Sequence, residues 1–150
     1  MKSLNNYQFF NHINDKYPLL DFELQLAEKK ILDPLVDHNL LLIIDKILRY
    51  QNYQTYKAPK INYPIVTLGS RVAIKTSDDN YTVDIVGIKE LGQNNETEYC
   101  TPSSPIAKAV IGKQIGETAL LTIHKPIEIK IISIDQTSVQ DDLKKQLASY

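Results

Sequence analysis

The sequence predicts an α+β protein, in which a helical hairpin arm over residues 1–58 precedes a small antiparallel sheet domain with one helix over residues 59–150. Two observations support this division. Before the segment Gln51–Pro64, apolar residues recur every three or four positions, which is typical of amphipathic helices. After it, apolar and polar residues alternate in short runs separated by turn-forming clusters such as Ser77–Asn80, which is typical of strands. The segment between the two parts is interpreted as a linker.

Two helices are expected in the arm, packed together as a short coiled coil. The first is expected to be capped by Asp21 and to stop at Asp33-Pro34, because proline disfavours helix at the residue before it. Asp33 is then the expected N-cap of the second helix, with Pro34 in its first turn. The stripes expected to face each other are Leu20, Leu24, Ala27 and Ile31 on the first helix, and Val36, Leu40, Ile43, Ile47 and Tyr50 on the second.

The second part of the chain is expected to form a sheet covered by one short helix. Ser103 or Ser104 can cap this helix, Pro105 suits its first position, and Gly112 can end it. A further short helix is expected at Asp141–Leu147. The expected strands are Ile65–Thr67, Arg71–Lys75, Tyr81–Ile88, Thr97–Cys100, Thr118–Ile123 and Ile127–Ile134.

Charge and composition exclude several classes of function. The net charge is −1, so the chain lacks the basic excess of a protein that grips nucleic acid by itself. The single cysteine, Cys100, excludes a disulfide framework, and the wide spacing of the histidines predicts no zinc site. The longest apolar run, Leu40–Ile44, is far shorter than the roughly 20 residues of a membrane span. A cytoplasmic protein without metal or cofactor is expected, with another protein as its partner.

Three stretches together resemble the C-terminal domain of the GreA/GreB family of bacterial transcription factors. They are Val66–Val72, Tyr81–Gly87 and Ser104–Glu117, the last with a serine-proline pair opening a helix and an Ile-Gly-Lys-x-x-Gly-Glu run closing it. The resemblance implies a fold similar to that of the FK506-binding proteins. It also implies that the serine-proline corner touches the rim of the secondary channel of RNA polymerase. The docking residues implied are Ser103, Ser104, Pro105, Ile106 and Ala107.

The arm departs from the pattern of the family members that stimulate transcript cleavage. In those factors a long coiled coil carries an acidic tip that holds a metal ion, whereas the two helices expected here are only roughly 18 and 25 Å long against about 45 Å needed. The family's tip motif is absent. Asp33 and Asp37 are candidate tip acids, although helix capping is the stronger explanation of both. The layout resembles that of the short-armed regulator of nucleoside diphosphate kinase, which implies binding to polymerase without cleavage.

The sequence therefore predicts a transcription regulator and not an enzyme. It is expected to be a monomer that binds RNA polymerase near the secondary channel and meets nucleic acid only through polymerase. One alternative is a Gre-type cleavage factor that uses Asp33 and Asp37. Another is a binding module of the FK506-binding-protein type with a different partner. Prolyl isomerase activity is disfavoured, because the chain has no tryptophan and its three phenylalanines precede the sheet domain.

Overall fold

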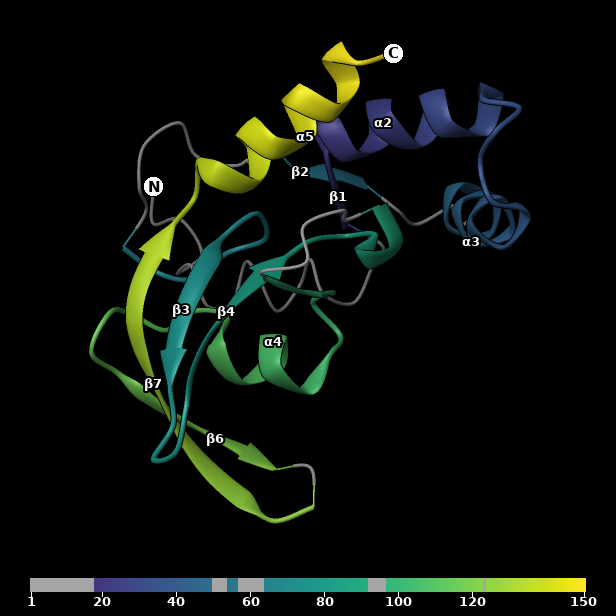
Figure 1. The fold of residues 1–150 in the computed structure, drawn as a ribbon. Coiled ribbons are helices and arrows are strands. Elements are labelled where there is room, and N and C mark those ends of the chain that lie inside the picture. Colours follow the sequence, from purple (N-terminus) through teal and green to yellow (C-terminus); the bar gives the residue numbers. More distant parts are fainter. Residues whose placement is uncertain (1–17, 50–53, 57–63, 92–96, 123) are drawn as a thin grey trace, which may run out of the picture.

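A computed structural model describes residues 18–49, 54–56, 64–91, 97–122 and 124–150. Figure 1 shows a curled sheet that holds helix α4 on one side, with helices α2 and α5 across one end. Within the described ranges, every helix is too short or too polar to cross a membrane. In chain order the elements are β1 (Pro18–Leu20), α2 (Asp21–Leu32), α3 (His38–Arg49), β2 (Gln54–Tyr56), β3 (Arg71–Lys75), β4 (Asn80–Ile85), the 3₁₀-helix η1 (Lys89–Leu91), β5 (Glu98–Cys100), α4 (Pro105–Val110), β6 (Thr118–Thr122), β7 (Pro126–Asp135) and α5 (Ser138–Ala148).

The five-stranded sheet has the order β5-β4-β3-β7-β6, and all of its pairs are antiparallel except β4 with β5. The prediction of a wholly antiparallel sheet was therefore wrong at one edge. Residues 86–97, which join these two strands, are long enough for the crossover that a parallel pair requires. The expected strand Ile65–Thr67 is also absent, and Ile65 forms only an isolated bridge with Gln114.

The segment predicted to be a linker contains strand β2, which pairs in parallel with β1 and so returns the chain to the start of the arm. Residues 57–63, where the boundary between the two parts was expected, lie outside the described residues. The division into 1–58 and 59–150 stays a prediction.

The helical hairpin of the arm is confirmed, with two corrections to its caps. Helix α2 follows Leu20 as its N-cap, not Asp21, and Glu23 accepts the Leu20 N–H at 2.9 Å. Helix α3 begins at His38, because Asp37 and not Asp33 accepts an N–H of its first turn. Asp33 keeps an extended backbone before Pro34 and accepts the N–H of Leu35 in the bend, so it ends α2 and shapes the turn.

The buried face of α2 is shifted by one residue from the expected stripe. Leu26 and Ala27 are buried on it together with the charged residues Glu23 and Lys30. This face packs against α5 as well as α3, and Figure 1 shows α5 beside the beginning of α2. Among the side chains described for α3, Ile44 is fully buried, with Leu40 and Ile47 half-buried around it.

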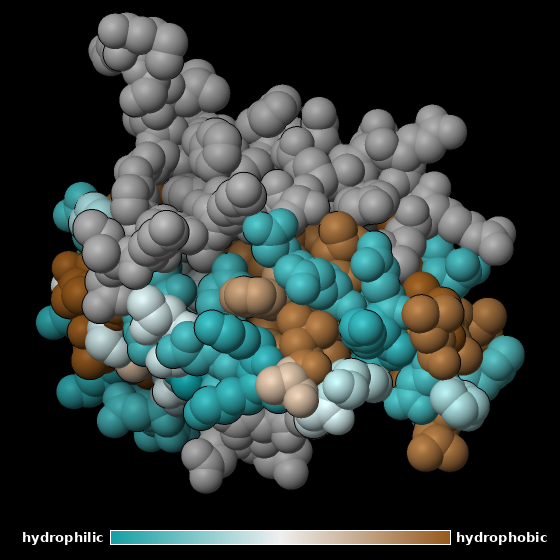
Figure 2. All heavy atoms as spheres, turned by 90° about the horizontal axis from the view of Figure 1, so that it is seen from above, coloured by the Kyte–Doolittle hydropathy of each residue, from teal (hydrophilic) through white to brown (hydrophobic). Residues whose placement is uncertain are grey.

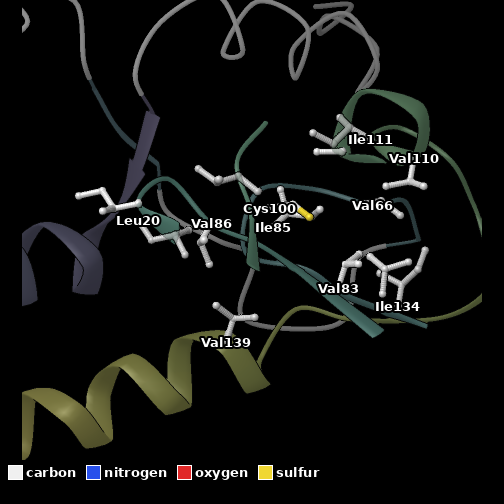
Figure 3. Close-up of a cluster of buried hydrophobic side chains, with 14 of the residues drawn as sticks. Leu20, Val66, Val83, Ile85, Val86, Cys100, Val110, Ile111, Ile134 and Val139 are labelled. Atoms are coloured by element: carbon white, nitrogen blue, oxygen red, sulfur yellow. The ribbon is translucent and has the colours of Figure 1, made fainter. Parts of the chain in front are cut away.

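One apolar core joins the arm to the sheet domain. Figure 3 shows Leu20 from the arm and Val139 from α5 in the same cluster as Ile85 and Val86 of the sheet domain. Burial of such side chains stabilises a fold by roughly 1.5–3 kcal/mol each. The arm is therefore not a free appendage, because its first helix helps to close the core at one end of the sheet.

The start of α5 offers a pH-dependent test of this fold. Asp135 accepts the backbone N–H groups of Thr137 at 2.8 Å and Ser138 at 3.1 Å, and also the Ser138 hydroxyl. Burial raises the pKa of Asp135, but these hydrogen bonds outweigh burial and lower it to about 2 from 3.8. Because the folded-state pKa is depressed, its stabilising contribution is complete above pH 3.8 and is lost as the pH falls towards 2.

We expect Asp135→Asn to lower the free energy of unfolding at pH 7 by about 1 kcal/mol, as for the loss of a helix cap. Urea denaturation at pH 7, 4 and 3 should show that the gap between the wild type and this variant narrows as the pH falls. Asp141→Asn, an exposed change in the first turn of the same helix, is the matched control. A gap that is constant with pH would contradict the assignment.

Candidate functional site

The corner that precedes α4 has the geometry predicted from its sequence. Ser104 is the N-cap, and its Oγ accepts the N–H of Ala107 at 3.3 Å. Pro105 occupies the first turn, where its missing N–H leaves no hydrogen bond unmade. The turn before it is closed by the Ser104 N–H, which donates to the Thr101 carbonyl at 2.9 Å. The corner is thus a hydrogen-bonded turn and not a loose loop.

The five residues implied as docking contacts differ in exposure. Ser103 and Pro105 are exposed, and Ser104 and Ile106 are half-buried. Ala107 is fully buried and packs in the core beneath the helix, so its side chain is not available to a partner. The surface that the corner can offer is therefore Ser103–Ile106, which we call the docking corner.

The glycines that follow α4 serve the backbone. Gly112 has a φ of 87° directly after the helix, a conformation that glycine adopts without steric cost. Its N–H donates to the Val66 carbonyl at 3.0 Å, and the Val66 N–H donates to the Lys113 carbonyl at 2.9 Å. These bonds fix the end of the helix to the segment that enters the sheet. The motif Ile-Gly-Lys-x-x-Gly-Glu is thereby explained as a helix ending and a turn.

The two candidate acids lie in the bend between α2 and α3, at the outer end of the arm. Each accepts a backbone N–H, Asp33 from Leu35 at 2.9 Å and Asp37 from Asn39 at 2.7 Å. In the described part of the chain, no group of three acidic, histidine or cysteine side chains is placed to hold a metal ion. The bend also exposes Leu32 and Leu35, at 80% and 92%. Figure 2 shows apolar side chains at this end of the molecule, on the right of the view.

Sequence reasoning missed Glu23, which links the arm to the sheet domain. Its side chain is fully buried, and its two oxygens accept the N–H groups of Leu20, Gly87 and Ile88 at 2.8–2.9 Å. Burial raises the pKa of this carboxyl, and the three backbone donors only partly offset that effect. The burial of Glu23 could have been suspected from the sequence, because Glu23 shares a helical face with Leu26 and Ala27. It was missed because an acid at the start of a helix is usually exposed to solvent.

A second charge cluster, buried only at Asp84, ties α5 to the sheet. Arg71 on β3 donates to both oxygens of Asp84 on β4, at 2.8 and 3.0 Å, and to Asp142 on α5 at 2.7 Å. Asp84 is only 1% exposed, and the bidentate bond raises the pKa of Arg71 above its usual value. The Arg71–Asp84 pair holds β3 and β4 in one arrangement, because a buried charge that loses its partner is strongly destabilising.

Comparison with known proteins gives a family match to the sheet domain. Residues 61–136 match the model described as "Transcription elongation factor, GreA/GreB, C-term", which is just over half of the chain. The transcription elongation factor GreA of Mycoplasma capricolum is 37% identical over 70 residues, which are 46% of this chain and 45% of that protein. The match therefore spans less than half the length of this relative.

Solved structures of related factors are also similar to the chain. GreA factor homolog 1 (Gfh1) of Thermus thermophilus is 16% identical with a TM-score of 0.39, over 79% of this chain and 97% of that protein. A GreA/GreB factor from Nitrosomonas europaea is 15% identical with a TM-score of 0.40, over the same shares of the two chains.

Proposed function

This chain belongs to the GreA/GreB family of transcription elongation factors, and from that premise we propose that it binds RNA polymerase at the entrance of the secondary channel through its docking corner. The observation that supports the proposal is the corner itself. It lies within the family-matched residues, it exposes Ser103 and Pro105, and its conformation is fixed by a capping bond and by Pro105. A preformed turn binds a partner at lower entropic cost than a flexible loop does.

The arm suits a steric mechanism better than the delivery of a metal ion. Helices α2 and α3 have 12 residues each, which corresponds to about 18 Å per helix. An arm of that length covers the mouth of a channel without reaching deep into it. Occupying the rim in this way excludes other factors that use the same entrance. We propose that the protein regulates transcription by this competition, as a cytoplasmic monomer without a cofactor.

The acids of the bend favour a factor that does not stimulate cleavage. Asp33 and Asp37 each have an oxygen engaged by a backbone N–H of the bend or of α3. Their positions are thus accounted for by the turn and by the helix cap. Mg²⁺ is usually bound by oxygen atoms of carboxylates and waters. Two aspartates that already accept backbone N–H groups are poorly suited to form such a site.

The proposal is tested by measuring binding to purified core RNA polymerase. In the Ser104→Glu/Ile106→Asp variant, two acidic side chains replace the cap and the apolar contact of the docking corner. We expect the dissociation constant to rise at least about tenfold, equivalent to about 1.4 kcal/mol. Ser133→Glu/Ile132→Asp places the same charges on exposed positions of β7, away from α4, and should leave binding unchanged.

A transcript-cleavage assay on arrested complexes then separates the two transcription functions. Binding without stimulated cleavage supports the competing regulator. Stimulated cleavage that is lost in Asp33→Asn means instead that the bend is a working acidic tip, and the steric proposal fails. If neither the wild type nor the variant binds polymerase, the sheet domain serves a different partner, and the proposed function is wrong as a whole.

A further inference from the structure

Helix α5 lies beyond the family-matched residues, yet it packs closely against the rest of the protein. The match ends at residue 136, and α5 begins at Ser138. Its side chains Val139 and Leu143 are buried, and Leu147 is half-buried, so one stripe along the helix faces the protein. This stripe meets α2 of the arm as well as the sheet domain. A helix that touches both parts is placed to control how they are oriented.

One side of α5 is fixed to the sheet by charge. The Asp142 carboxylate accepts from Arg71 at 2.7 Å, and Arg71 is itself held by both oxygens of Asp84. The two hydrogen bonds from Arg71 to Asp84 hold the guanidinium in place, so it cannot follow α5 if the helix moves. Asp142 is therefore anchored to a rigid point on β3 and β4.

The same side of α5 also faces the first turns of α2. A cavity of only about 10 Å³ between them is lined by Glu23 of α2, by Ile88, Leu91 and Tyr99 of the sheet domain, and by Val139, Asp142 and Leu143 of α5. That volume is at the lower limit for one water molecule, so the joint is closely packed. Glu23 accepts the N–H groups of Gly87 and Ile88 there, which fixes α2 to the sheet domain from below.

Helix α5 lies beside the beginning of α2, as Figure 1 shows. It contacts α2 more extensively than α3 does. Among the side chains described for α3, Ile44 is fully buried.

We infer that α5 is a strap that holds the helical arm at one angle to the sheet domain, with the Asp142–Arg71 ion pair as its latch. The bend of the arm and the docking corner then move as one rigid body. If the proposed function is correct, the strap decides where the arm lies over the polymerase channel once the corner has docked. The inference about the geometry of the arm does not itself depend on polymerase.

The test is a distance measurement between the arm and the sheet domain in the full chain. Spin labels are attached at Asn39→Cys in α3 and Glu128→Cys in β7, both exposed positions, in a Cys100→Ala background. Double electron–electron resonance should give a single narrow distance for the wild-type strap. Asp142→Arg sets two cations against each other and should replace this distance by a broad or shifted distribution.

Asp141→Arg is the matched control, because it makes the same change of charge one residue earlier on an exposed position of α5. It should keep the narrow distance. An unchanged distribution in Asp142→Arg would overturn the inference. A second label pair within the sheet domain, at Ser77→Cys and Glu128→Cys, continues the opposed positions of β3 and β7, and the dipolar broadening of its continuous-wave spectrum must persist in every variant. If Asp142→Arg unfolds that domain, Asp142→Asn, which removes the latch without repulsion, is measured in its place and should broaden the arm distance alone.

Polymerase binding separates failure of the strap from failure of the proposed function. The docking corner makes no hydrogen bond or ion pair with α5 in the described part of the chain. Asp142→Arg should therefore bind core polymerase as tightly as the wild type, while its competition with other channel-binding factors is weakened. Loss of binding in all forms, wild type included, would disprove the polymerase proposal and leave the distance result unaffected.

Discussion

Replacing Glu23 by alanine should lower the free energy of unfolding by about 3 kcal/mol or more. The change removes the acceptor of three N–H groups, those of Leu20, Gly87 and Ile88. Each buried donor that is left without a partner costs roughly 1–3 kcal/mol. Glu28→Ala, on an exposed position of the same helix, should change the stability by less than about 0.5 kcal/mol. Urea denaturation followed by circular dichroism measures both. Equal and small effects would show that α2 is not held by this carboxylate.

The pH dependence of the same site gives a second readout. Burial raises the pKa of Glu23 above its unfolded value, so the folded protein binds this proton more tightly than the unfolded chain does. Its contribution to stability is therefore complete below the unfolded pKa of about 4.5 and declines as the pH rises through the folded pKa. Glu23→Gln, which cannot titrate, should lack this decline. The wild type should therefore lose stability relative to Glu23→Gln as the pH rises from 4 to 8.

Local rules were sufficient for much of the fold and for the docking corner. The serine-proline pair predicted a capped helix, because a hydroxyl acceptor and a residue without an N–H suit adjacent positions at a helix start. The strand Arg71–Lys75 has the predicted bounds, since its alternation between sheet faces is uninterrupted. The correct cap of α3, Asp37, could also have been predicted from the sequence. Both Asp33 and Asp37 can cap, and the extended backbone that Pro34 imposes on Asp33 favoured the later one.

The features that sequence reasoning missed depend on contacts between distant residues. Alternation within β5 says which residues face the core but not which strand lies beside it, so the parallel pair with β4 was not predicted. Glu23 is separated by more than sixty residues from the donors at Gly87 and Ile88. The packing of α5 on α2 joins the two ends of the described chain. No local pattern encodes such pairs, and the joint between arm and sheet domain became visible only in the structure.

Arg71→Met is expected to be the most destabilising of the charge substitutions, at about 3–5 kcal/mol. The methionine is apolar and of similar length, so the loss comes from the charge and not from a cavity. Asp84, which is 1% exposed, would lose its ion pair, and the contact described between it and the Thr97 hydroxyl is long, at 3.5 Å. Lys75→Met makes the same kind of change on an exposed position of the same strand and should be almost neutral. Similar losses in the two variants, measured by urea denaturation, would contradict the importance of the pair.

The double variant Arg71→Met/Asp84→Leu separates the two roles of Arg71. An apolar pair can replace a buried ion pair with little loss, because no unpaired charge remains in the core. The double variant should therefore recover most of the stability that Arg71→Met loses. It cannot restore the bond to Asp142, so the arm distance should stay broad although the sheet domain is stable again. If recovery of stability also restored the narrow distance, burial of Val139 and Leu143 alone would hold the strap, and the ion pair would not be its latch.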